Sequence, residues 1–320
     1  MKRAARAVAL LGTMAAWSAD AHADVVVEWA FVGDAGNVDD VHGQGYGGVD
    51  YDYYIGRHEV TNGQYIDFLN AVAAEDTYAL YCTAMGGGYM GLAGITRYGS
   101  PGSYTYGPRD GDTDWLNKPV NWVNWYDALR FANWLHNGQP TGAQDASTTE
   151  DGAYTFTDRY SAGDRNQGAH VFLPTEDEWY KAAYYKGGGT NAGYWDFATQ
   201  NDDLPTCEPP PGGSNSANGD NAAGGPTDVG AYYLSGSAYG TFDQTGNMFE
   251  WVETAIGSAR LLRGGSWNTG GGYLQSYFRY NDCPTDETNY YGFRVASIPE
   301  PATLSLLALA AGVVLRRRGR

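Results

Sequence analysis

The side chains best suited to bind a soft metal or to act as nucleophiles are few in this chain. Three cysteines could supply one disulfide and one remaining thiol, and the sequence alone does not choose the pair. Three cysteines are too few for a four-cysteine zinc site. The five histidines are scattered, and no two of them have the i, i+4 spacing of a helical metal pair. These residues are Cys82, Cys207 and Cys283, with His22, His42, His58, His136 and His170.

Two further kinds of catalytic motif lack their essential parts. Glycine-rich stretches at 86–88 and 187–189 have neither the lysine nor the strand-to-helix context of a phosphate-binding loop. No Gly-x-Ser-x-Gly elbow occurs, and the sequence indicates no histidine partner for Ser266. The motifs therefore favour neither nucleotide hydrolysis nor serine-hydrolase chemistry.

The overall charge argues against another class of function. The 320 residues include 20 Lys and Arg against 37 Asp and Glu, which gives a formal net charge of −17. A nucleic-acid binder needs a basic patch, so we expect no nucleic-acid partner. With 45 Gly, 26 Tyr and only 18% charged residues, the composition indicates a loop-rich globular domain.

The elements that would hold a site are short, and long irregular segments separate them. Strand-like patterns at 25–32 and 51–55 precede a helix that begins at the capping box of residues 61–64. A second helix is predicted from about Asn124, and a third from the capping box of residues 175–178. The motif residues expected to fill the core are Trp125, Trp179 and Trp251.

Both ends of the chain have the pattern of sorting signals. Residues 1–23 combine a basic start, an apolar stretch and a small-x-small sequence, which predicts a secretory signal peptide removed by signal peptidase. Residues 298–320 combine Pro-Glu-Pro, an apolar run and an arginine cluster, and they resemble the PEP-CTERM sorting signal. That resemblance implies processing by an exosortase in a Gram-negative bacterium, after transient membrane association. The expected organisation leaves one domain at 24–297.

Six motifs within this domain occur in a fixed order. Together they resemble the formylglycine-generating enzyme (sulfatase-modifying factor) family over about residues 25–296. The resemblance implies an α+β fold that is irregular, loop-rich and C-type-lectin-like, with a few short helices and small antiparallel sheets. The motifs are IGRHEVTN (55–62), PVNWVNW (119–125), LPTEDEW (173–179), DQTGNMFEW (243–251), RGGSW (263–267) and GFR (292–294).

The resemblance implies a copper oxidase, from which this chain departs. Family enzymes oxidise a sulfatase cysteine to formylglycine with Cu(I) held by two cysteines shortly after the Gly-Gly-Ser motif. Residues 266–279 contain no cysteine, and Thr269 stands about where the first thiol is expected. Cys283 lies beyond the expected pair, and a lone thiolate is a poor copper clamp. We therefore expect neither a copper cofactor nor the oxidase chemistry.

A second branch of the family forms carbon–sulfur bonds with iron held by three histidines, which are largely supplied by an additional domain. We expect no such domain here. His58 and His136 are accordingly interpreted as structural or surface residues.

The resemblance also implies a structural Ca²⁺ ion in the loop that ends in Gly-Asn-x-x-Glu-Trp. Its ligands on this chain would be the side chains of Asp243 and Glu250 and the carbonyls of Gly246 and Met248. Hard oxygen donors suit Ca²⁺, and Gly246 permits a tight turn. The alternative is a β-turn in which Glu250 forms a structural ion pair.

A second calcium site of the family begins at an asparagine that Asn218 matches. The Gly219 carbonyl would stand beside it. The following ligands do not align with this chain, so only these two are carried over.

Together with the resemblance, the sequence predicts an exported domain similar to sulfatase-modifying factor that acts as a calcium-stabilised, non-catalytic binding or structural module. Its expected location is the periplasm, the outer surface or the extracellular matrix. Its expected partner is an extracellular polysaccharide or a surface protein. The alternative is a formylglycine-generating oxidase with unconventional metal ligands, so enzymatic activity stays an open question here.

Overall fold

The computed structural model describes residues 24–41, 45–87 and 91–298 of the chain. The predicted signal peptide lies outside the described residues, as does the predicted sorting segment beyond Ile298. Within the described part, no helix combines the length and the apolar character needed to cross a membrane.

The regular elements are short. The α-helices are α1 (Asn62–Val72), α2 (Trp125–His136) and α3 (Glu176–Tyr184), and the 3-10 helices are η1 (Thr83–Gly86), η3 (Arg109–Gly111), η4 (Thr113–Trp115) and η5 (Gly271–Tyr273). The strands are β1 (Trp29–Val32), β2 (Tyr53–Gly56), β3 (Ile95–Tyr98), β4 (Thr105–Pro108), β5 (Phe156–Asp158), β6 (Ser161–Ala162), β7 (Val171–Phe172), β8 (Thr206–Cys207), β9 (Ser216–Ala217), β10 (Phe249–Ile256), β11 (Ala259–Arg263), β12 (Tyr280–Asp282), β13 (Tyr291–Phe293) and β14 (Ala296–Ser297).

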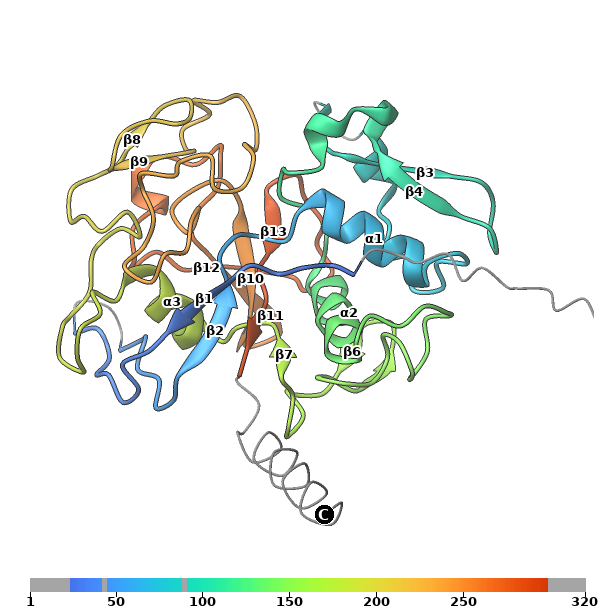
Figure 1. The fold of residues 1–320 in the computed structure, drawn as a ribbon, viewed down its shortest axis with the longest axis horizontal. Coiled ribbons are helices and arrows are strands. Elements are labelled where there is room, and N and C mark those ends of the chain that lie inside the picture. Colours follow the sequence, from blue (N-terminus) through green and yellow to red (C-terminus); the bar gives the residue numbers. More distant parts are fainter. Residues whose placement is uncertain (1–23, 42–44, 88–90, 299–320) are drawn as a thin grey trace, which may run out of the picture.

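Two four-stranded sheets form the frame of the described part, with strand orders β1-β2-β14-β7 and β12-β11-β10-β13. Three smaller pairs, β3-β4, β5-β6 and β8-β9, lie outside them. Figure 1 shows β10 and β13 near the centre, with α1 and α2 on one side and α3 with the β8–β9 loops on the other. The sheet that contains β10 and β13 is built from residues 249–293 and lies between elements that come earlier in the chain.

This arrangement confirms the predicted α+β, loop-rich fold. One detail differs from the expected antiparallel sheets, because β13 pairs with β10 in parallel and β9 pairs with β8 in parallel. A parallel neighbour brings the segment just after β13 alongside the β10 strand, and this determines which residues meet in the core.

The three helices begin where their capping residues predict. Thr61 and Thr175 each accept the N–H three residues on, which confirms both capping boxes. Asn124 forms a third box, in which its side chain accepts the N–H groups of Tyr126 and Asp127. The sequence pattern missed this box because an aspartate replaces the usual Glu or Gln.

The three motif tryptophans lie in the core as predicted. Each is at most 1% exposed, and each indole N–H has an acceptor, so burial leaves no unsatisfied donor. The acceptors of Trp125, Trp179 and Trp251 are, in order, the Val252 carbonyl, the Glu250 carboxylate and the Val123 carbonyl.

Loss of the α3 cap should destabilise the whole domain, because this helix carries Trp179 into the core. We expect Thr175→Ala to lower the free energy of unfolding by about 1 kcal/mol, since the Glu178 N–H loses its acceptor. Urea denaturation measures this change. Thr175→Ser keeps the hydroxyl and should stay close to the wild type; equal destabilisation of both variants would contradict the capping role.

Candidate functional site

A fully buried ion pair lies at the centre of the molecule. Glu250 on β10 and Arg294, directly after β13, are both 0% exposed. The Arg294 guanidinium donates from two nitrogens to the two Glu250 oxygens, each at 2.6 Å. Trp179 Nε1 also donates to Glu250 Oε2 at 2.8 Å. The carboxylate thus forms the structural ion pair that was the alternative to its calcium role.

Arg294 also holds the surrounding backbone together. It donates to the carbonyls of Gly56 and Arg57 at 3.0 and 3.2 Å, and to the Phe242 carbonyl at 2.9 Å. Its pKa is raised because Glu250 lies beside it. One guanidinium therefore joins β2, the loop before Asp243 and the β10 strand.

The same region contains more carboxyl groups than cations. Glu59 is 2% exposed and accepts an amide N–H from Asn247 at 2.9 Å, and its Oε2 is buried without a hydrogen-bond partner. Burial raises the pKa of Glu59 well above its usual value, and the nearby Asp243 and Glu250 raise it further. Burial likewise raises the pKa of Asp243 to about 6. Three buried acids thus lie near one buried cation, Arg294, and only Glu250 bonds to it directly.

Asn218 and Gly246, one residue from each predicted calcium site, lie side by side. Asn218 and Gly246 form an isolated parallel bridge, and the Asn218 carbonyl accepts the Asn247 N–H at 2.9 Å. Gly246 has φ +90°, and a Cβ there would lie 2.3 Å from the Asn218 carbonyl oxygen. Only glycine fits this position, which agrees with the expectation that Gly246 permits a tight turn. Met248 follows and is fully buried.

The predicted ligands differ in how well they fit a hard cation. The buried Asn218 Oδ1 atom has no hydrogen-bond partner, and among the described residues Asp243 accepts only the Gly230 N–H. Both side chains therefore retain oxygen lone pairs for a cation. The Glu250 carboxylate already accepts three hydrogen bonds, which leaves it little remaining capacity.

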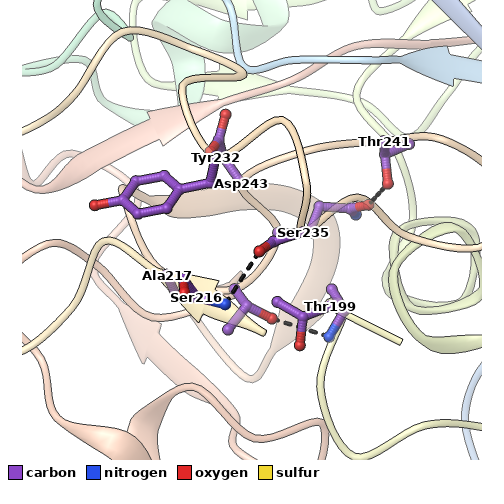
Figure 2. A pocket seen from close by; sticks show the side chains of 10 residues that line it. Thr199, Ser216, Ala217, Tyr232, Ser235, Thr241 and Asp243 are labelled. Atoms are coloured by element: carbon purple, nitrogen blue, oxygen red, sulfur yellow. Dashed lines mark hydrogen bonds between the residues drawn. The ribbon is translucent and has the colours of Figure 1, made fainter. Parts of the chain in front are cut away.

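Hydroxyl groups surround a small hollow next to Asp243. The hollow has room for about one water molecule, and Figure 2 shows hydroxyl side chains around it together with the Asp243 carboxylate. Its wall is tied together internally, for example by the Ser216 N–H, which donates to Ser235 Oγ at 3.0 Å. The lining hydroxyl residues are Thr199, Ser216, Tyr232, Ser235, Thr241 and Thr245.

In the loop where the family resemblance places the copper thiols, a threonine hydroxyl bonds to the backbone of Ser266. Thr269 Oγ1 accepts the Ser266 N–H at 2.8 Å and donates to the Ser266 carbonyl at 3.0 Å. The side chain at this position is therefore occupied in holding a turn. Leu274, which follows in the same segment, is fully buried and anchors the loop in the interior.

The thiol of Cys207 lies close to this loop. A methyl group built on Gly219 would lie 2.9 Å from Cys207 Sγ, 3.1 Å from Leu274 Cδ1 and 3.1 Å from the Thr269 carbonyl. Burial raises the Cys207 pKa, and Asp220 raises it further, so the neutral thiol predominates near pH 7. No sequence spacing signals this neighbour.

The disulfide that the sequence allowed is not formed. Cys82, Cys207 and Cys283 are all free thiols in the structure. Cys207 packs beside Gly219, whereas the exposed Cys283 lies near the Thr285 hydroxyl, with 3.2 Å between Sγ and Oγ1.

The histidines are arranged differently from one another. His58 stacks on Phe242 with ring centroids 5.4 Å apart. His136 and His170 form a close pair with centroids 4.0 Å apart, which the sequence did not reveal. A separation of 34 residues has no helical or strand periodicity that could have indicated the contact.

His58 should make stability depend on pH. Burial, with Arg294 and Arg57 nearby, lowers its pKa to about 4, so the folded state favours the neutral ring. This contribution is fully present above the unfolded value near 6.5 and is lost as the pH falls towards 4. Allowing for partial exposure, we expect wild type to lose about 1–2 kcal/mol more than His58→Gln between pH 7 and 4. Parallel pH profiles from urea denaturation would contradict this assignment.

Two family profiles match this chain, one over the domain and one over the C-terminal segment. The profile of the sulfatase-modifying factor enzyme 1-like domain matches residues 48–298, and that of the PEP-CTERM protein-sorting motif matches residues 297–318. The boundaries expected at 23/24 and 297/298 stay predictions. The sorting motif indicates export, membrane-anchored sorting and processing by an exosortase.

Two similar proteins are hercynine oxygenases. That of Mycolicibacterium smegmatis is 30% identical over 150 residues, covering 39% of this chain and 32% of the relative. That of Mycobacterium tuberculosis is 26% identical over 270 residues, covering 76% of this chain and 52% of the relative. The matches thus span about a third to a half of these relatives' length.

A solved structure, Treponema denticola variable protein 1, is 19% identical with a TM-score of 0.47, covering 85% of this chain and 95% of that chain. The family profile covers most of the chain and includes all six motifs. The chain belongs to the sulfatase-modifying factor enzyme 1-like domain family.

Proposed function

We propose that this exported protein is a non-catalytic member of its family that acts as a binding or structural module. Its place would be the periplasm, the outer surface or the extracellular polysaccharide matrix. Its partner would be an extracellular polysaccharide or a surface protein.

The observation that carries this proposal is the hydrogen bonding of the Thr269 hydroxyl to the backbone of its own turn. A Cu(I) clamp needs two soft thiolates facing one ion. Here the Thr269 hydroxyl is bonded within its own turn, and a hydroxyl is no substitute for a thiolate. Cys207 supplies one neighbouring sulfur, and its raised pKa disfavours the thiolate. The hercynine oxygenases match over only part of their length, so their activity is not carried to this chain.

Calcium would stabilise this module, and the buried charge supports that part of the proposal. Glu59, Asp243 and Glu250 together carry more negative charge than Arg294 offsets when they are ionised. Burying an uncompensated charge is unfavourable, so a further cation there would be stabilising. Asp243 and the carbonyls of Gly246 and Met248, with the Glu250 carboxylate beside them, are the groups that would hold it, and Asn218 with the Gly219 carbonyl would begin the second site. The ion would supply rigidity to these loops.

Removal of calcium should therefore lower the melting temperature. An ion that binds only the native state at about a hundred times its Kd adds about 2.7 kcal/mol, which corresponds to roughly 5–10 °C in a domain of this size. We expect EGTA to lower the melting temperature of the wild type by this amount. Asp243→Asn should melt lower and respond little to EGTA, because it keeps the side-chain shape but loses the charge.

Asp228→Asn is the matched control, since Asp228 is half-exposed and forms its ion pair with the Lys118 ammonium, 3.1 Å away. This control should respond to EGTA as the wild type does. A wild type that melts at the same temperature with and without EGTA would contradict the calcium site. Glu250 is unsuitable for this test because its removal would also leave Arg294 unpaired.

The binding role is tested with the exopolysaccharide of the producing bacterium. We expect the purified protein to be retained on the immobilised polysaccharide or on a surface protein of the same cell, and a heat-denatured sample to pass through. If the protein binds neither the polysaccharide nor a surface protein, the proposed binding role is contradicted.

A parallel assay separates this outcome from the oxidase alternative. The protein is incubated with Cu(I), oxygen and a sulfatase-type cysteine peptide, beside an active family enzyme. We expect mass spectrometry to show no conversion of the thiol to an aldehyde. Conversion by the wild type that disappears in Cys207→Ser would favour the oxidase with an unconventional copper clamp.

A further inference from the structure

Two histidines from distant parts of the chain meet at the surface of the domain. His136 is the last residue of α2, and His170 directly precedes β7. Both are partly exposed, and their rings lie at an interplanar angle of 41° with centroids 4.0 Å apart. The contact connects the end of a helix to the edge strand of the β1-β2-β14-β7 sheet.

Apart from one long hydrogen bond, the ring nitrogens of this pair have no protein partner among the described residues. His136 Nδ1 accepts the backbone N–H of His170 at 3.3 Å, which is long for a hydrogen bond and directs a ring lone pair towards His170. No other hydrogen bond or ion pair among the described residues reaches either ring. Burial and the neighbouring His170 lower the pKa of His136, so its ring is neutral near pH 7. Neutral imidazole is the form that binds metals.

The separation of the rings is close to that of two imidazoles on one ion. With metal–nitrogen distances of 2.0–2.1 Å, two rings on one tetrahedral ion have centroids about 5 Å apart. The rings here would need to separate by about 1 Å, which a rotation of two partly exposed side chains can provide. The long hydrogen bond between His136 and the His170 backbone would be replaced by a metal–nitrogen bond.

We propose that His136 and His170 form a two-histidine site for a first-row transition-metal dication such as Zn²⁺. Imidazole suits this class of metal, whereas the predicted calcium ligands are hard oxygens. Within the described residues no third His, Cys, Asp or Glu completes a cluster, so water fills the other coordination positions. The ion cross-links α2 to β7 across 34 residues of chain and is independent of the proposed binding role.

Zinc titration of the purified protein tests this site. Calcium is kept in excess so that the oxygen sites are filled, and ZnCl₂ is titrated by isothermal calorimetry at pH 7.5. We expect saturable binding by the wild type and a higher melting temperature with zinc. His136→Gln and His170→Gln should each weaken the affinity at least about tenfold, because each removes one of only two protein ligands.

His58→Gln is the matched control, because it removes a histidine that stacks on Phe242 away from the pair. It should bind zinc as the wild type does. Melting curves without zinc should show that all three variants are folded. The proposal is overturned if the wild type binds no zinc, or if either His136→Gln or His170→Gln binds it with wild-type affinity, which would place the metal on the cysteines or elsewhere.

Discussion

The buried pair of Glu250 and Arg294 is the interaction on which the rest of the structure depends. Both residues are fully buried, so the free energy of removing two charges from water must be offset by good geometry. Two parallel hydrogen bonds and the Trp179 indole meet that requirement. Because removal of one partner leaves a buried charge, such a change costs about 3–5 kcal/mol. The guanidinium also bonds three backbone carbonyls, and this fixes the loops around it.

This constraint gives most of the family motifs a structural role in this chain. Arg294 comes from the GFR motif, Glu250 from DQTGNMFEW and Trp179 from LPTEDEW. Glu59, from IGRHEVTN, accepts the Asn247 amide N–H in the same core. The motifs thus meet in one buried network rather than in an open cleft. A match to them specifies the fold, whereas function depends on loop residues that the fold does not dictate.

Local sequence patterns predicted the parts of this fold that depend on neighbouring residues. The capping boxes at 61–64 and 175–178 were predictable because a helix start is decided within one turn. The burial of the motif tryptophans followed from their size and apolarity. The resemblance to a family supplied the overall architecture, but it assigned Asn218 and Gly246 to separate sites, and their pairing is seen only in the structure.

The parts that could not be predicted all depend on long-range contacts. Glu250 and Arg294 are 44 residues apart, and the parallel pairing of β13 with β10 brings them together. His136 and His170 likewise meet only through the packing of α2 against β7. Cys207 reaches the Thr269 loop across Gly219, and no spacing rule links these segments. In each case the chain between the partners carries no periodic signal of their contact.

The central proposal is that this member of the family has no copper clamp, although its family motifs form a buried network. Anaerobic competition for Cu(I) between the reduced protein and a chromophoric Cu(I) chelator tests it most directly. The account predicts that the chelator takes all the copper, from the wild type and from Cys207→Ser alike. Stoichiometric Cu(I) retained by the wild type and released by Cys207→Ser would contradict it.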